Sequence, residues 1–200
     1  MGDSNRWKQR QANDPYVKQA KKDGYRARSS YKLLEIQQKH RIFKPGDRVF
    51  DAGAAPGGWS QVARQAIGPH GKVIACDILS IDPLPGVQFI QGDLTHAETQ
   101  QKVVSTSTKS FDVALCDVSP NLTGDRWVDQ YRFFETISPI IALCLQLLKP
   151  NGHLLFKIFE GPELDSFMKI QKKNFLSVKW IKPQASRDRS AEKYVLGSKA

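Results

Sequence analysis

The residues from Val49 to Ser60 constrain the fold of this chain more than any other stretch. They read Val-Phe-Asp-Ala-Gly-Ala-Ala-Pro-Gly-Gly-Trp-Ser, an apolar run that ends in a carboxylate and continues through a glycine-rich loop. This order is typical of the first strand, loop and helix of a doubly wound α/β domain, where ligands bind at the carboxyl ends of parallel strands. Glycines in such a loop let the backbone approach a ligand closely.

The loop departs from the pattern of a dinucleotide site. Gly53, Ala55 and Gly58 give G-x-A-x-x-G in place of G-x-G-x-x-G, and Pro56 lacks the amide that a pyrophosphate could use. The loop therefore favours a nucleoside ligand without phosphates over NAD. A tight turn that binds no ligand is the alternative.

The rest of the chain alternates between strand and helix patterns. Strands are expected at 48–52, 72–77, 87–91, 111–117 and 152–158, with a hairpin-like final pair at 177–182 and 193–197. Helices are expected near 15–22, 29–40, 60–67, 97–106, 129–148 and 164–173. This predicts an α/β fold, a single Rossmann-like domain with a mainly parallel seven-stranded sheet and helices on both faces. We expect residues 1–14 to be a flexible basic N-terminal segment and residues 15–200 to form the domain.

Charge is segregated along the chain. Residues 1–44 carry a net charge of +8, residues 45–168 a net charge of −5, and residues 169–200 a net charge of +7. A basic head and tail around an acidic centre indicate a cationic surface for nucleic acid. Tyrosines and a tryptophan among the basic residues favour RNA, whose unpaired bases stack on such rings. These aromatic residues could equally pack the N-terminal helix onto the core. A solvated basic surface without a partner is the alternative.

Acidic residues end successive predicted strands and would share one edge of a parallel sheet. These are Asp51, Asp77, Asp93 and Asp117. Asp77 follows Gly57 by twenty residues, close to the spacing of about 20 at which an acid meets ribose hydroxyls. Asp93 could accept from an adenine amino group. Any one of these could be a turn or cap residue, but four on one edge predict a nucleoside cofactor, with S-adenosyl-L-methionine as the first candidate.

Several classes of protein are disfavoured. The longest apolar stretch, 137–148, is too short to span a bilayer, and the polar N-terminus does not resemble a secretory signal. Three cysteines without C-x-x-C spacing are expected to be core residues in a reducing compartment, and no metal site is expected.

Seven segments together resemble the FtsJ-type ribosomal RNA ribose 2′-O-methyltransferases, of the bacterial large-subunit kind. They occur in the family's order and cover nearly everything after about residue 15: Gly24–Leu33, Asp51–Gln61, Ala75–Asp77, Gly92–Asp93, Asp117–Gly124, Lys157–Gly161 and Lys182–Tyr194. The one small departure is Ala52, where the family usually has a larger aliphatic residue such as leucine.

The resemblance implies a catalytic tetrad of two lysines and two acids, which falls on Lys32, Asp117, Lys157 and Glu192. Cofactor contacts are implied for Gly57, Trp59, Asp77, Asp93 and Asp117, with Gly53 shaping the loop. It also implies S-adenosyl-L-methionine as cofactor and a cytoplasmic, monomeric methyltransferase. The expected substrate is large-subunit (23S) ribosomal RNA, at a uridine of the A-loop.

Methyl transfer to a ribose hydroxyl needs a positioned base, because the hydroxyl is a poor nucleophile. Lys157 is the candidate base. Burial and the charge of Lys32 would favour its neutral amine, whereas Asp117 and Glu192 would favour the ammonium form.

The segment from Asp117 to Pro120 lacks the aromatic residue that amino-methylating enzymes stack on a flipped base, which favours ribose over base methylation. Two alternatives remain. One is a 2′-O-methyltransferase for tRNA or an mRNA cap, and the other is a non-catalytic RNA-binding module with a degenerate methyltransferase fold.

Overall fold

The structure, a computed structural model, describes residues 14–119, 123–187 and 190–200. The expected flexible segment 1–14 therefore lies outside the described residues except for Asp14. Pro120, which belongs to the comparison with amino-methylating enzymes, also lies outside them.

A seven-stranded sheet organises the molecule, with strand order β3-β2-β1-β4-β5-β7-β6. Its strands are β1 (Arg48–Ala52), β2 (Lys72–Asp77), β3 (Val87–Gln91), β4 (Phe111–Cys116), β5 (Leu148–Phe159), β6 (Phe175–Ile181) and β7 (Glu192–Lys199). All neighbours from β3 to β5 pair in parallel, and β7 pairs antiparallel with both β5 and β6. The predicted mainly parallel seven-stranded sheet is confirmed, including its hairpin-like end.

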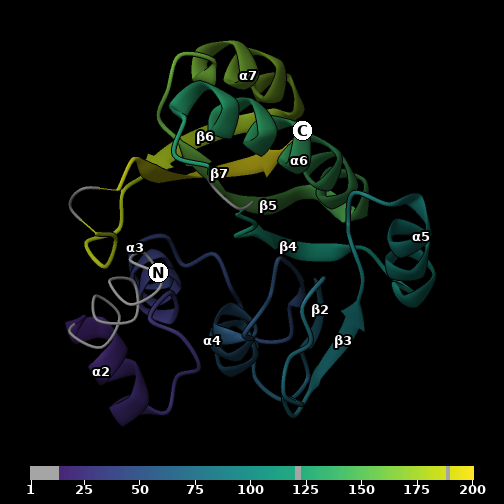
Figure 1. Cartoon of the computed structure of the whole chain (residues 1–200). Coiled ribbons are helices and arrows are strands. Elements are labelled where there is room, and N and C mark those ends of the chain that lie inside the picture. Colours follow the sequence, from purple (N-terminus) through teal and green to yellow (C-terminus); the bar gives the residue numbers. More distant parts are fainter. Residues whose placement is uncertain (1–13, 120–122, 188–189) are drawn as a thin grey trace.

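Helices cover both faces of the sheet, as Figure 1 shows. The helices are α2 (Pro15–Asp23), α3 (Ser30–His40), α4 (Gly58–Ile67), α5 (Ala97–Thr106), α6 (Arg126–Leu147) and α7 (Leu164–Gln171), followed by a short 3-10 turn (Lys172–Asn174). Residues of α3 and α4 pack in one core cluster, and residues of α5, α6 and α7 pack in the other.

Adjacent residues of β1 show how the pattern of the sequence builds these two cores. Val49 packs with the α3–α4 cluster and Phe50 with the α5–α7 cluster, because successive side chains of a strand point to opposite faces. Both are fully buried. A strand that is buried on both faces has a nearly continuous run of apolar residues, and this explains the apolar run at the start of β1.

The main difference from expectation concerns β5, which begins at Leu148 and not at residue 152. Phe111 pairs with Leu148, but Val113 pairs with His153, so the residues between them bulge out of the ladder. Asn151 adopts a φ of 61° within this bulge. Proline and asparagine at this point resemble a turn, which is why the sequence pattern misses the first residues of the strand.

Candidate active site

The sheet order reverses next to β1, whose neighbours are β2 and β4. In doubly wound folds the crevice outside such a reversal is where ligands bind. The loop between β1 and α4 lies at this point and contains Gly53 with φ 77° and Gly57 with φ 99°. A Cβ on Gly53 would lie 2.6 Å from Cγ2 of Val118, so only glycine lets the loops after β1 and β4 approach this closely.

Asp77 and Asp93 lie where β2 and β3 end. The two oxygens of Asp77 accept hydrogen bonds from the backbone N–H groups of Ala55 and Leu79, both at 2.9 Å. Oδ1 of Asp93 accepts from the hydroxyl of Thr95 at 2.7 Å and from its N–H at 2.8 Å. The hydroxyl contact, followed by the N–H contact, lowers the pKa of Asp93. Both carboxylates are therefore held in place and retain lone pairs for a ligand.

Asp51 does not join these two acids at the open edge, contrary to expectation. It lies within β1, is fully buried, and accepts a hydrogen bond from the Ser60 hydroxyl at 2.6 Å. Burial, the largest influence, raises its pKa to about 7. The sequence places Asp51 next to the loop, but its side chain points into the contact between β1 and α4 and is closed off from a ligand.

Trp59 has a different placement from the other residues expected to contact a cofactor. The residue is 3% exposed, its indole N–H donates to the Ser29 carbonyl at 2.9 Å, and its ring packs on Tyr194 at 5.5 Å between centroids. Contact with a cofactor would therefore have to use the backbone of Trp59 and not its ring. Gly57, two residues before Trp59, is the N-cap of α4. Because glycine has no side chain, it leaves the first N–H groups of the helix without a side-chain acceptor.

The four expected catalytic residues meet as two lysine–acid pairs. Nζ of Lys157 lies 2.9 Å from the carbonyl oxygen of Asp117 and 3.2 Å from its Oδ1. Nζ of Lys32 lies 2.6 Å from Oε1 of Glu192. Lys157 comes from β5, Glu192 from β7 and Lys32 from α3. Residues separated by up to 160 positions in the chain thus lie in one cluster.

Tyr194 joins the two pairs, and the sequence reasoning missed this role. Its hydroxyl donates to Oδ1 of Asp117 at 3.0 Å and accepts from Nζ of Lys32 at 3.4 Å. Burial, followed by the charges of Asp117 and Glu192, raises the pKa of Tyr194 well above its ordinary value. The phenol is therefore a neutral bridge. Its position two residues after Glu192 on one strand was the available signal, since such residues share a face.

Glu192 is held ionised in a buried setting. Burial raises its pKa, but the charge and hydrogen bond of Lys32, the charge of Lys157 and a hydrogen bond from Ser186 together place it below the ordinary value. The Ser186 hydroxyl lies 3.1 Å from Oε1. The two lysines and two acids balance in charge, which allows the cluster to be buried.

Acidic side chains at the reversal of a doubly wound sheet, with a cluster of two lysines and two acids beside them, fit a Rossmann-like transferase. Within that class, the chain belongs to the FtsJ-like methyltransferase family, whose model matches residues 25–200. It is 46% identical over 191 residues to ribosomal RNA large subunit methyltransferase E of Pseudomonas fluorescens, covering 95% of this chain and 91% of the relative. It is 46% identical over 198 residues to the protein of that name from Azoarcus, covering 97% and 95%.

Solved structures agree with this family in fold. A chain described as a ribosomal RNA methyltransferase from Plasmodium falciparum superposes with a TM-score of 0.78 at 26% identity, covering 88% of this chain and 98% of that one. An rRNA methylase from Clostridium thermocellum matches with a TM-score of 0.56 at 17% identity and shares the fold alone, covering 83% and 97%.

The described part of the chain holds neither a metal-binding cluster of side chains nor a membrane-spanning helix. No group of three or more histidine, cysteine, aspartate or glutamate side chains is arranged there to hold a metal ion. In the same ranges, no helix combines the length and apolar character needed to cross a membrane.

Proposed function

We propose that this enzyme transfers a methyl group from S-adenosyl-L-methionine to a ribose 2′-hydroxyl of large-subunit (23S) ribosomal RNA, at a uridine of the A-loop. The observation that carries the proposal is the cluster of two lysine–acid pairs bridged by Tyr194 at the end of β5, beside the open edge of the sheet. The proposal places the enzyme in the cytoplasm, acting as a monomer. The names of the bacterial relatives support the choice of RNA.

The residues at the sheet edge fit S-adenosyl-L-methionine chemically. Carboxylates at Asp77 and Asp93 suit ribose hydroxyls and an adenine amino group. Ile78 and Leu79 follow Asp77 and are 61% and 63% exposed, which offers apolar surface for a purine ring. The N-terminus of α4 at Gly57 lacks a side-chain cap, and free N–H groups at a helix N-terminus suit the carboxylate of a methionine moiety.

When bound, the cofactor supplies an electrophilic methyl group, so the protein has to orient the hydroxyl and take its proton. The base in this mechanism is the amine that forms once the Lys157 ammonium group of the charge-balanced cluster has lost a proton, and this amine has two N–H bonds and one lone pair. Its two contacts with Asp117 use both N–H bonds, which leaves the lone pair for the proton of the ribose hydroxyl. Lys32 is paired with Glu192, so it can orient the substrate without presenting an uncompensated charge.

Labelled S-adenosyl-L-methionine incubated with large ribosomal subunits, with tRNA and with capped RNA tests the proposed substrate. Label should enter the large-subunit RNA only, and label in tRNA or in the cap would transfer the proposal to those substrates. Alkaline hydrolysis then tests the atom that is methylated. A methylated 2′-oxygen cannot attack the adjacent phosphate, so the labelled nucleotide should resist cleavage, whereas a methylated base would leave cleavage unchanged.

A further inference from the structure

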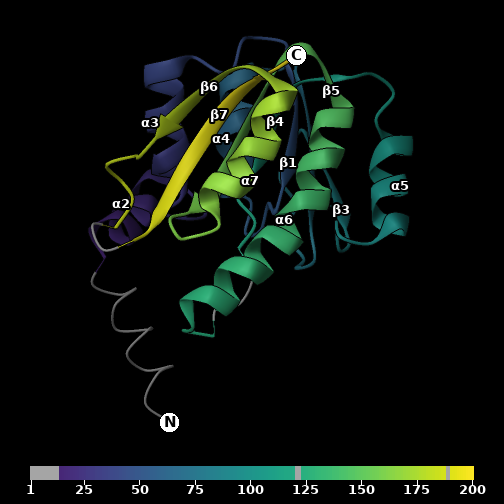
Figure 2. The same ribbon diagram turned by 90° about the horizontal axis from the view of Figure 1, so that it is seen from above.

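Asp14 joins the two basic ends of the chain. Its Oδ2 lies 2.6 Å from Nη1 of Arg28, and it lies 3.2 Å from Nη2 and 3.3 Å from Nε of Arg187. Arg28 also donates to the carbonyl of Ala185. The segment that leads to β7 therefore lies against the N-terminal helices, as both Figure 1 and Figure 2 show.

This three-residue cluster carries an excess of one positive charge, because two guanidinium groups share one carboxylate oxygen. The side chains of Asp14 and Arg28 are 8% and 16% exposed, but that of Arg187 is 49% exposed. The excess charge is thus open to solvent on the side of Arg187. A partly desolvated guanidinium with one open side is suited to a second anion.

The geometry of Arg187 favours a phosphate as that anion. Asp14 holds the Nε and Nη2 edge of the guanidinium, which leaves the edge formed by Nη1 and Nη2. That edge is a planar fork that matches two oxygens of a phosphate. Among the described residues, Nη1 of Arg187 has no acceptor. Lys182, in contrast, donates to the carbonyls of Ser190 and Glu192, so its ammonium group holds the loop before β7 and is less available to an anion.

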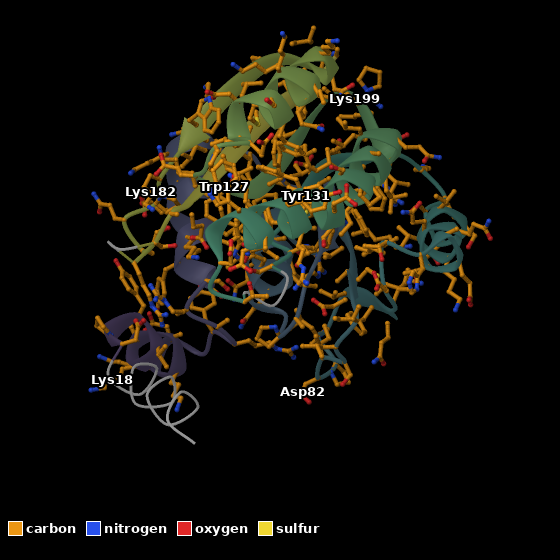
Figure 3. The ribbon with its side chains drawn as sticks, turned by 45° about the horizontal axis from the view of Figure 1, so that its top comes forward. Lys18, Asp82, Trp127, Tyr131, Lys182 and Lys199 are labelled. Atoms are coloured by element: carbon orange, nitrogen blue, oxygen red, sulfur yellow. The ribbon has the colours of Figure 1, made fainter. Side chains whose placement is uncertain are left out.

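The position of Arg187 relates it to the catalytic cluster. The preceding residue, Ser186, hydrogen-bonds Glu192, which pairs with Lys32. An anion on Arg187 would therefore lie at the rim of the site that takes the target ribose. Exposed lysines on α2 extend this basic surface, and Figure 3 shows Lys18 on the same side of the molecule as Lys182.

We propose that Arg187, oriented by Asp14 and backed by Arg28, binds a backbone phosphate of the RNA close to the target ribose. This inference rests on the proposed function, because it takes the substrate to be RNA. Asp14 is then a positioning residue that keeps the guanidinium fork directed outward. Arg187 would contact the phosphate backbone of the RNA and not its bases, so the contact adds affinity without adding sequence specificity.

The test is the affinity of the enzyme for a radiolabelled large-subunit RNA transcript, measured by filter binding between about 50 and 200 mM salt. Arg187→Gln should weaken binding by about tenfold at low salt and reduce the slope of log affinity against log salt by about one. Arg187→Lys keeps the charge but loses the fork, so it should retain the slope and lose part of the affinity. Lys109→Gln makes the same change in charge at an exposed residue just before β4, at the amino ends of the parallel strands, and should leave both quantities unchanged.

Equal affinities and slopes for the wild type and Arg187→Gln would overturn the inference, whatever the methyl-transfer assay shows. An equal loss in Lys109→Gln would also overturn it, because the effect would then reflect net charge only. If label fails to enter large subunits but Arg187→Gln still lowers the slope, the proposed substrate is wrong and the phosphate site stands.

Discussion

The buried carboxyl of Asp51 should make the stability of this protein depend on pH in an unusual direction. Asp51 is fully enclosed, and burial raises its pKa in the folded state to about 7, from 3.8 for an unperturbed aspartate. The folded protein therefore keeps this proton over a range of pH in which the unfolded chain has lost it. Stability should fall as pH rises from about 4 to about 7 and then level off.

The magnitude follows from the shift in pKa. Each pKa unit corresponds to about 1.4 kcal/mol, so the full cost of about three units is about 4 kcal/mol. Between pH 5 and pH 8 the wild type should lose about 3 kcal/mol of that stability. Asp51→Asn cannot titrate and keeps an oxygen to accept from the Ser60 hydroxyl, so this part of the pH dependence should vanish.

Urea unfolding of the two proteins at several pH values between 5 and 8 measures the effect. The free energy of unfolding of Asp51→Asn minus that of the wild type should increase by about 3 kcal/mol across this range. The constant cost of placing an amide in the core cancels, because only the change with pH is compared. Asp165→Asn, at an exposed carboxylate of α7, is the control and should follow the wild type. Parallel curves for the wild type and Asp51→Asn would refute a neutral buried carboxyl.

Three further predictions concern the site. Lys157→Ala should bind cofactor normally in calorimetry but lose methyl transfer, because no other amine among the described residues contacts Asp117 in this way; near-normal turnover would exclude Lys157 as the base. Asp77→Ala should weaken cofactor affinity by about 10- to 100-fold, the worth of hydrogen bonds to a charged acceptor, with Asp77→Asn intermediate; unchanged affinity would refute the ribose contact. Tyr194→Phe should lower stability by about 1 kcal/mol and reduce kcat without changing cofactor affinity, since only the bridging hydroxyl is lost; unchanged kcat would show that the bridge does not position the lysines.

Local sequence patterns predicted most of the fold, because strands, turns and helices depend mainly on residues that are close together in the chain. The apolar run of β1, its glycine-rich loop and the alternation that follows each depend on residues close together in the chain. The ends of β5 and the burial of Asp51 were not predictable in this way. The first depends on pairing with Phe111 across the sheet, and the second on the packing of α4 against β1.

The cluster of two lysine–acid pairs was predictable only through the resemblance to a family. Lys32 and Glu192 are far apart in sequence, and no spacing rule brings a helix residue next to a strand that enters the sheet last. The roles of Trp59 and Tyr194 are long-range in the same sense. Each ring takes its position from the other, since they pack together at an interplanar angle of 38° in the α3–α4 core.

On the proposed function, the distribution of charge in the fold gives the lysine–acid cluster and the basic ends separate tasks. Asp77 and Asp93, at the ends of β2 and β3, make the edge proposed for the cofactor negative, which suits a sulfonium cofactor but repels the backbone of RNA. The catalytic cluster itself is balanced in charge and cannot offset that repulsion. The basic head and tail can, because Asp14 brings Arg28 and Arg187 together beside Glu192. On the proposed function, the acidic and basic parts of the sequence therefore form two adjoining surfaces. The acidic surface binds the sulfonium cofactor, and the basic surface binds the RNA.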